Sequence, residues 1–77
     1  MEIDTQKIDD TVLALLYLTR FEEGGGIGAW KGHDWDALNR LHEKGLISEP
    51  RSKAKSIIFS EDGAKRAKQL FEKLFVK

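Results

Sequence analysis

The stretch LHEKGLISEPRSKAKSIIFSEDGA, residues 41–64, decides the fold that the sequence predicts. It contains the end of one helix, two short β-rich segments around a polar loop, and the start of another helix. The first of these helices is capped by Asp34 and runs through Lys44, with its apolar residues on one side. Gly45 follows at the position where many helices end in a left-handed conformation.

Two segments of this stretch are predicted to pair as a β-hairpin. Residues 46–49 are short and extended, and residues 55–59 are rich in β-branched and aromatic side chains. Residues 50–54 form a polar loop between them. Ser60 then caps a final helix with one apolar stripe, so the order in this half is helix, hairpin, helix.

The amino-terminal part adds one more helix and a glycine-rich segment. The helix is predicted from about Thr5 to Phe21, and it is apolar around so much of its girth that it must be covered on more than one side. Residues 22–32 contain five glycines and are predicted as a loop, with a short strand or helical turn near Ala29 to Gly32 as the alternative. We expect one α+β domain over residues 1–77, with three main helices and a two-stranded hairpin.

The segments LHEKGLI (41–47) and FSEDGA (59–64) resemble the recognition helix, wing and following helix of winged helix-turn-helix regulators, in particular the MarR and PadR groups. This resemblance spans roughly Asp34 to Phe75. It implies a small winged-helix domain, double-stranded DNA as a partner and dimerisation through terminal helices. The chain departs from the pattern before Asp34, because a glycine run stands where a positioning helix is needed.

The whole chain also resembles a family of small bacterial proteins of unknown function. The residues that carry this second resemblance are Ile3-Asp4 to Leu18, Trp30-Lys31-Gly32 and Asp34-Trp35-Asp36. It implies a bacterial origin and no particular activity.

The composition limits where the protein works. The chain has no cysteine, which excludes disulfides, cysteine-bound zinc and thiol catalysis and favours a reducing compartment. Its first residues are acidic where a secretory signal would be basic. The longest apolar run, Val12–Leu18, is far shorter than the roughly 20 residues of a membrane span. We expect a cytoplasmic protein without membrane contact.

The net charge is zero, but the charges are unevenly distributed. Residues 1–36 hold three basic and eight acidic side chains, whereas residues 37–77 hold ten basic and five acidic ones. This asymmetry favours either a basic face that attracts a polyanion or contact with the acidic half of another copy. An ordinary solvated surface of mixed charge is the alternative.

Six residues are candidates for contacts with double-stranded DNA. Those on the exposed side of the second helix have the side-chain types that read base edges, and those in the wing would contact phosphates. Against this function, several acidic residues lie nearby and the chain has no net positive charge. The six are Asn39, Arg40, Lys44, Arg51, Lys53 and Lys55.

Protein binding or self-association is the alternative function. A small core gains from dimerisation, and the apolar girth of the first helix together with aromatic residues near the carboxyl end could supply the contact. The same side chains could instead pack against each other within one chain. The candidates are Leu13, Tyr17, Phe71 and Phe75.

Other kinds of site are weakly indicated. Trp30 and Trp35 are predicted to close the core beneath the glycine loop, with an exposed stacking platform for a base or peptide as the alternative. His33 and His42 lack the further ligands that a metal site needs, and His42 is expected to be hydrogen-bonded at the border of the core. No nucleophile, base and orienting group occur together, so we expect neither catalysis nor a cofactor.

Overall fold

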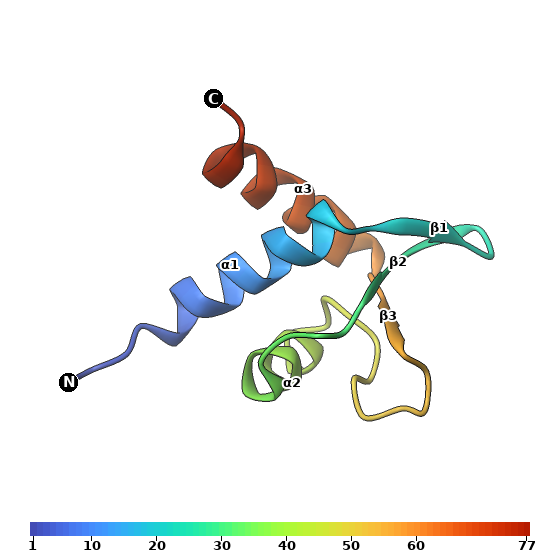
Figure 1. Cartoon of the computed structure of the whole chain (residues 1–77), viewed down its shortest axis with the longest axis horizontal. Coiled ribbons are helices and arrows are strands. Elements are labelled where there is room, and N and C mark those ends of the chain that lie inside the picture. The colour runs from blue at the N-terminus through green and yellow to red at the C-terminus, as the bar shows by residue number, and fades with distance from the viewer.

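A computed structural model describes all 77 residues as an α+β domain with three helices and one three-stranded antiparallel sheet (Figure 1). The predicted fold class is confirmed, and the architecture is compatible with a small winged-helix-like domain. In chain order the elements are α1 (Thr5–Leu18), β1 (Phe21–Glu23), β2 (Gly26–Trp30), α2 (Trp35–Glu43), β3 (Ser56–Ile58) and α3 (Glu61–Phe75).

The glycine-rich segment forms a β-hairpin, so its prediction as a loop was wrong. Only Gly24 and Gly25 form the turn, with φ angles of +56° and +85° that suit glycine. β1 pairs with β2 so that Phe21 faces Gly28 and Glu23 faces Gly26. The short strand expected as an alternative near Ala29 therefore exists, but it begins earlier, at Gly26.

β2 is the central strand and β3 pairs with it, whereas residues 46–49 form no named strand. Ala29 faces Ile57 and Trp30 faces Ser56 across the β2–β3 ladder. Residues 46–49 are joined to residues 58–60 by an isolated antiparallel bridge between Ile47 and Phe59 and by hydrogen bonds, among them Ser48 N to Ile58 O at 2.8 Å and Ser60 N to Leu46 O at 3.0 Å. The predicted pairing of these two segments is thus present only as a bridge, and the sheet itself has three strands with β1 and β3 at its edges.

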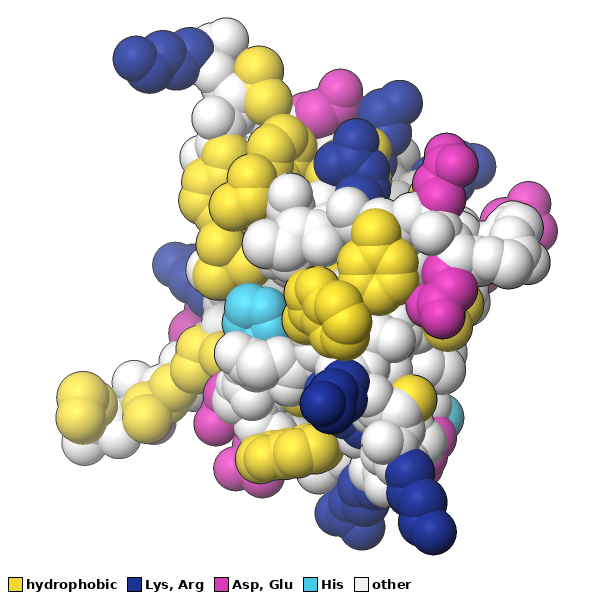
Figure 2. Space-filling model, turned by 45° about the vertical axis from the view of Figure 1, so that its right-hand side comes forward, with side chains coloured by type: hydrophobic (Ala, Val, Ile, Leu, Met, Phe, Trp, Pro, Cys, Tyr) yellow, Lys and Arg dark blue, Asp and Glu magenta, His cyan; other side chains and the backbone are white.

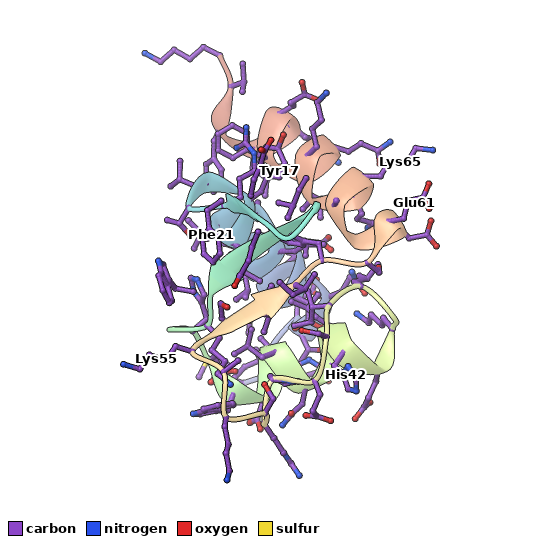
Figure 3. All side chains as sticks on the ribbon, turned by 90° about the vertical axis from the view of Figure 1, so that its right-hand side faces the viewer. Tyr17, Phe21, His42, Lys55, Glu61 and Lys65 are labelled. Carbon is purple, nitrogen blue, oxygen red and sulfur yellow. The ribbon has the colours of Figure 1, made fainter.

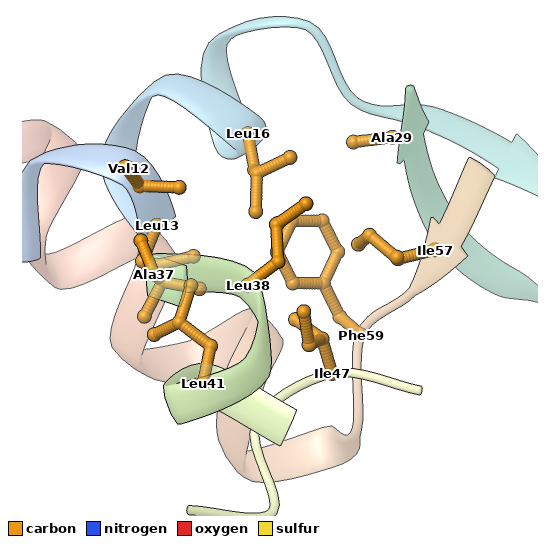
Figure 4. Packing of buried hydrophobic residues seen from close by; sticks show 11 residues of the cluster. Val12, Leu13, Leu16, Ala29, Ala37, Leu38, Leu41, Ile47, Ile57 and Phe59 are labelled. Carbon is orange, nitrogen blue, oxygen red and sulfur yellow. The ribbon is translucent and has the colours of Figure 1, made fainter. Parts of the chain in front are cut away.

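The core lies between the helices and the inner face of the sheet (Figure 4). α1 packs against both α2 and α3, which explains why it is apolar around so much of its girth. Ala29 and Ile57 point inward from neighbouring strands because side chains alternate between the faces of a strand. The buried cluster consists of Val12, Leu13, Leu16, Ala29, Ala37, Leu38, Leu41, Ile47, Ile57, Phe59 and Ala67.

Hydrogen bonds cap all three helices and confirm the two caps predicted above, Asp34 and Ser60. Asp4 caps α1 by accepting from Lys7 N at 3.2 Å, and Asp34 caps α2 by accepting from Ala37 N at 3.1 Å. Ser60 Oγ accepts from Gly63 N at 2.9 Å and donates to Gly45 O at 2.6 Å. Ser60 therefore joins the start of α3 to the end of α2 as well as capping its own helix.

Candidate functional site

The outer face of the sheet carries an exposed aromatic surface. Phe21, Trp30 and Ile58 lie on the outer face; 58% of Trp30 is exposed, Ile58 is exposed to a smaller extent, and Phe21 is half-buried. The rings of Phe21 and Trp30 pack with centroids 5.3 Å apart at an angle of 46°. Figure 2 shows an apolar patch on this side of the molecule with basic side chains below it. We call Phe21, Trp30 and Ile58 the aromatic face.

A basic loop lies beside the aromatic face, at the end of β2 that carries Trp30. Its position is fixed by Lys31, whose Nζ donates to Pro50 O at 2.6 Å and to Ser52 O at 2.7 Å. Lys31 N also donates to Lys55 O at 3.2 Å, which continues the β2–β3 pairing into the loop. We call residues 50–55 the basic loop, because they include Arg51, Lys53 and Lys55.

The three cations of the basic loop are exposed, and none forms an ion pair. Figure 3 places Lys55 on the same side of the molecule as Phe21, and Lys65 of α3 on the opposite side. The structure therefore places the loop that carries the three predicted wing residues at the Trp30 end of the sheet.

The two cations predicted on α2 are held by a buried carboxylate. Asp9 of α1 is 1% exposed and accepts from Arg40 Nε at 2.9 Å, with Arg40 Nη2 at 2.8 Å and Lys44 Nζ at 3.2 Å. Burial raises the pKa of Asp9, but the hydrogen bonds and charges of Arg40 and Lys44 outweigh burial and lower it below its usual value. The bond to Asp9 in turn raises the pKa of Arg40.

Because Arg40 and Lys44 join α2 to α1, they would have to leave a buried carboxylate uncompensated in order to reach DNA bases. The third predicted residue of α2, Asn39, is half-buried. A recognition role for α2 also lacks its usual support, since the chain between α1 and α2 forms the β1–β2 hairpin and contains no positioning helix.

The residues predicted for a dimer contact fall into two environments. Leu13 is 1% exposed and lies in the core, so the folded chain leaves it no surface for a partner. Leu13 is therefore not available for the predicted dimer contact. Tyr17, Phe71 and Phe75 pack in a row, with ring centroids 5.4 Å and 5.8 Å apart. Only Phe75 is exposed, together with Leu74 and Val76 at the end of α3.

The tryptophans lie outside the core, contrary to the favoured prediction. Trp35 is 53% exposed at the first turn of α2, and Lys31 Nζ lies 5.8 Å from its ring centroid. The core is filled without the indoles, since Leu16, Ile57 and Phe59 meet beneath the sheet. The alternative prediction of exposed aromatic rings is the one that agrees with the structure.

His42 has the hydrogen-bonded environment expected of it. Its Nδ1 lies 3.0 Å from Ile47 O, and its Nε2 lies 3.4 Å from a carboxylate oxygen of Glu49. No three His, Cys, Asp or Glu side chains are grouped so that they could hold a metal ion. None of the three helices has the length and apolar character that crossing a membrane requires.

The fold and these surfaces define a small α+β domain with an exposed aromatic face beside a basic loop. The chain belongs to the family described as Domain of unknown function (DUF6429), whose model matches residues 4–77. It is 51% identical over 77 residues to the uncharacterized protein y4hR of Sinorhizobium fredii (strain NBRC 101917 / NGR234), and the match covers all of both chains. No solved structure matches the chain. The predicted resemblance to a small bacterial family of unknown function is confirmed.

Proposed function

We propose that this protein is a non-enzymatic, cytoplasmic binding module whose partner is nucleic acid. The observation that carries this proposal is that a loop with three exposed cations lies at the end of the sheet that carries the exposed ring of Trp30. Cations placed beside aromatic side chains suit a ligand that has both phosphates and planar bases.

The basic loop is the part of the surface that suits phosphates best. Arg51, Lys53 and Lys55 are exposed, and Lys31 uses its own charge to hold the loop by its carbonyl groups. A loop with a fixed base and free cationic side chains can follow a phosphate backbone without reading base edges. The proposal therefore keeps the wing residues of the predicted DNA site and does not depend on Arg40 and Lys44.

Replacing Arg51, Lys53 and Lys55 together by alanine is expected to weaken nucleic-acid binding about tenfold at low salt. The slope of log affinity against log salt concentration is expected to fall by about three, because each lost phosphate contact removes roughly one. Fluorescence anisotropy with a labelled mixed-sequence duplex and with one of its strands, repeated at rising salt concentration, measures both effects.

The matched control removes three lysines from α3; Figure 3 places one of them, Lys65, on the side of the molecule opposite Lys55. Lys65, Lys68 and Lys73 are exposed on α3, so changing them to alanine removes the same charge without touching the basic loop. The proposal predicts almost no change for this variant. Equal losses in the two triple variants, or no binding of either oligonucleotide at low salt, would contradict it.

A specific observation also favours self-association as a second function. Leu74, Phe75 and Val76 are exposed together at the end of α3, where the chain offers them no cover. A second copy would bury these residues, and the acidic amino-terminal and basic carboxyl-terminal halves of two copies attract each other.

If this second function holds, the wild-type protein sediments with the mass of two chains at high concentration, and Phe75→Glu sediments as one. The reason is that a carboxylate in an apolar contact costs free energy when it loses water. Ile3→Glu is the control, since Ile3 is an exposed apolar residue in the amino-terminal tail before α1. A monomeric wild-type protein at all concentrations would exclude this function.

A further inference from the structure

We infer that the aromatic face binds unpaired bases, so that the nucleic acid of the proposed function is single-stranded. This inference rests on the proposed function and adds a ligand class to it. Trp30 would supply the stacking ring, because its indole is exposed and is supported from one side by Phe21. A ring already held by another ring loses little conformational freedom when a base packs on it.

Gly28 allows the aromatic face to be continuous. A Cβ atom at this position would lie 3.2 Å from Phe21 Cε1 and 3.1 Å from Ile58 Cδ1. Without that atom, Phe21 and Ile58 can approach each other across β2. Gly26 is the next residue of β2 on the same face, so Trp30 is the only side chain that β2 places there, and the exposed part of its indole is the surface left for a base.

The charges around the aromatic face favour a nucleic-acid strand over an apolar protein segment. The basic loop lies at the Trp30 end of β2, whereas Glu23 lies at the other end, opposite Gly26. Phosphates are attracted to the first end and repelled from the second. Aromatic rings beside a cationic groove are the combination by which single strands are bound without sequence reading, whereas a duplex keeps its base faces stacked inside.

The test uses a labelled deoxythymidine oligomer of about 12 nucleotides, within the site sizes that such surfaces cover. Trp30→Ala is expected to weaken its binding roughly 10- to 100-fold, and Trp30→Phe to recover most of that loss, since stacking contributes about this much per base. Affinity for a duplex of mixed sequence should change less than about threefold in Trp30→Ala. Circular dichroism checks that each variant is folded.

Trp35→Ala is the matched control, because it removes the other exposed indole and leaves Trp30 as the only tryptophan. This variant is expected to bind the oligomer like the wild type, and its remaining emission should be quenched by the oligomer.

The outcomes separate this inference from the proposed function. If Trp30→Ala binds the oligomer normally while the basic-loop variant does not, base stacking is overturned and the proposed function stands. Equal losses of oligomer and duplex binding in Trp30→Ala also overturn it. If the emission of Trp30 in Trp35→Ala shifts with protein concentration alone, a second copy covers the aromatic face and the inference fails. If no nucleic acid binds to the wild type, the proposed function itself fails.

Discussion

Gly63→Ala is expected to unfold the protein or to lower its free energy of unfolding by about 3 kcal/mol or more. Gly63 lies in the first turn of α3, and a Cβ atom there would overlap the carbonyl oxygen of Leu46 and lie 2.6 Å from its carbonyl carbon. The backbone of Leu46 cannot rotate away from the new Cβ atom, as a flexible side chain could. α3 would have to move away from Leu46, which would break the hydrogen bonds that Ser60 makes to Leu46 O and Gly45 O.

Urea denaturation, followed by circular dichroism and by tryptophan emission, measures this effect. Gly32→Ala is the matched control, since Gly32 has no positive φ and a Cβ atom there meets nothing within 4 Å. Its free energy of unfolding should stay within about 0.5 kcal/mol of the wild type. Wild-type stability in Gly63→Ala would contradict this prediction, because it would mean that α3 does not begin against the Leu46 backbone.

The helices could be predicted because their signals are local. The side-chain oxygens of Asp34 and Ser60 cap their helices by accepting a hydrogen bond from the backbone amide three residues further along the chain. The apolar stripes of α2 and α3 follow from their own residues. Even so, the predicted end of α1 near Phe21 was wrong: the helix ends at Leu18, and no glycine or proline between Leu18 and β1 marks that end in the sequence.

The sheet could not be predicted from local signals. β2 contains Gly26 and Gly28, and glycine is disfavoured in strands unless something lies close to its backbone. Phe21 lies close to Gly28 on one side and Ile58 lies close to it on the other. Ile58 is 30 residues from Gly28 along the chain. The number of glycines therefore indicated a loop. The segment forms a strand because other side chains pack against the glycines in the folded chain.

The exposure of Trp30 and the burial of Asp9 were missed for a related reason. Trp30 is exposed because strand alternation directs Ala29 inward, which could be inferred only once β2 was known to be a strand. Asp9 did have a signal, since it lies four residues before Leu13 and seven before Leu16 and so shares their buried side of α1. Its partner Arg40 lies 31 residues away, so the ion pair itself was not visible in the sequence.

Asp9→Asn is expected to lower the free energy of unfolding at neutral pH by about 2–4 kcal/mol. The amide keeps the size of the carboxylate but removes its charge, which leaves Arg40 and Lys44 without their common partner between α1 and α2. This loss of stability lies toward the lower end of the range for a buried ion pair, because Arg40 and Lys44 are both partly exposed and can be hydrated once the carboxylate is gone.

Asp10→Asn is the control at the neighbouring position. Asp10 is partly exposed, pairs with Arg66 Nη2 at 3.7 Å and accepts from Gln6 Nε2 at 2.8 Å. Its removal should cost less than about 1 kcal/mol. If the two variants lose the same stability, Asp9 does not have a special role in joining α1 to α2.

The dependence on pH distinguishes a lost ion pair from a packing defect. Because the pKa of Asp9 is lowered in the folded protein, its carboxylate stabilises the fold above the unfolded pKa of about 3.9. That stabilisation disappears as the pH falls through the lower folded pKa. The stability difference between wild type and Asp9→Asn should therefore be constant from pH 7 to about pH 5 and shrink below about pH 4. A difference that stays the same at low pH would show that the amide disturbs packing and that the charge contributes little.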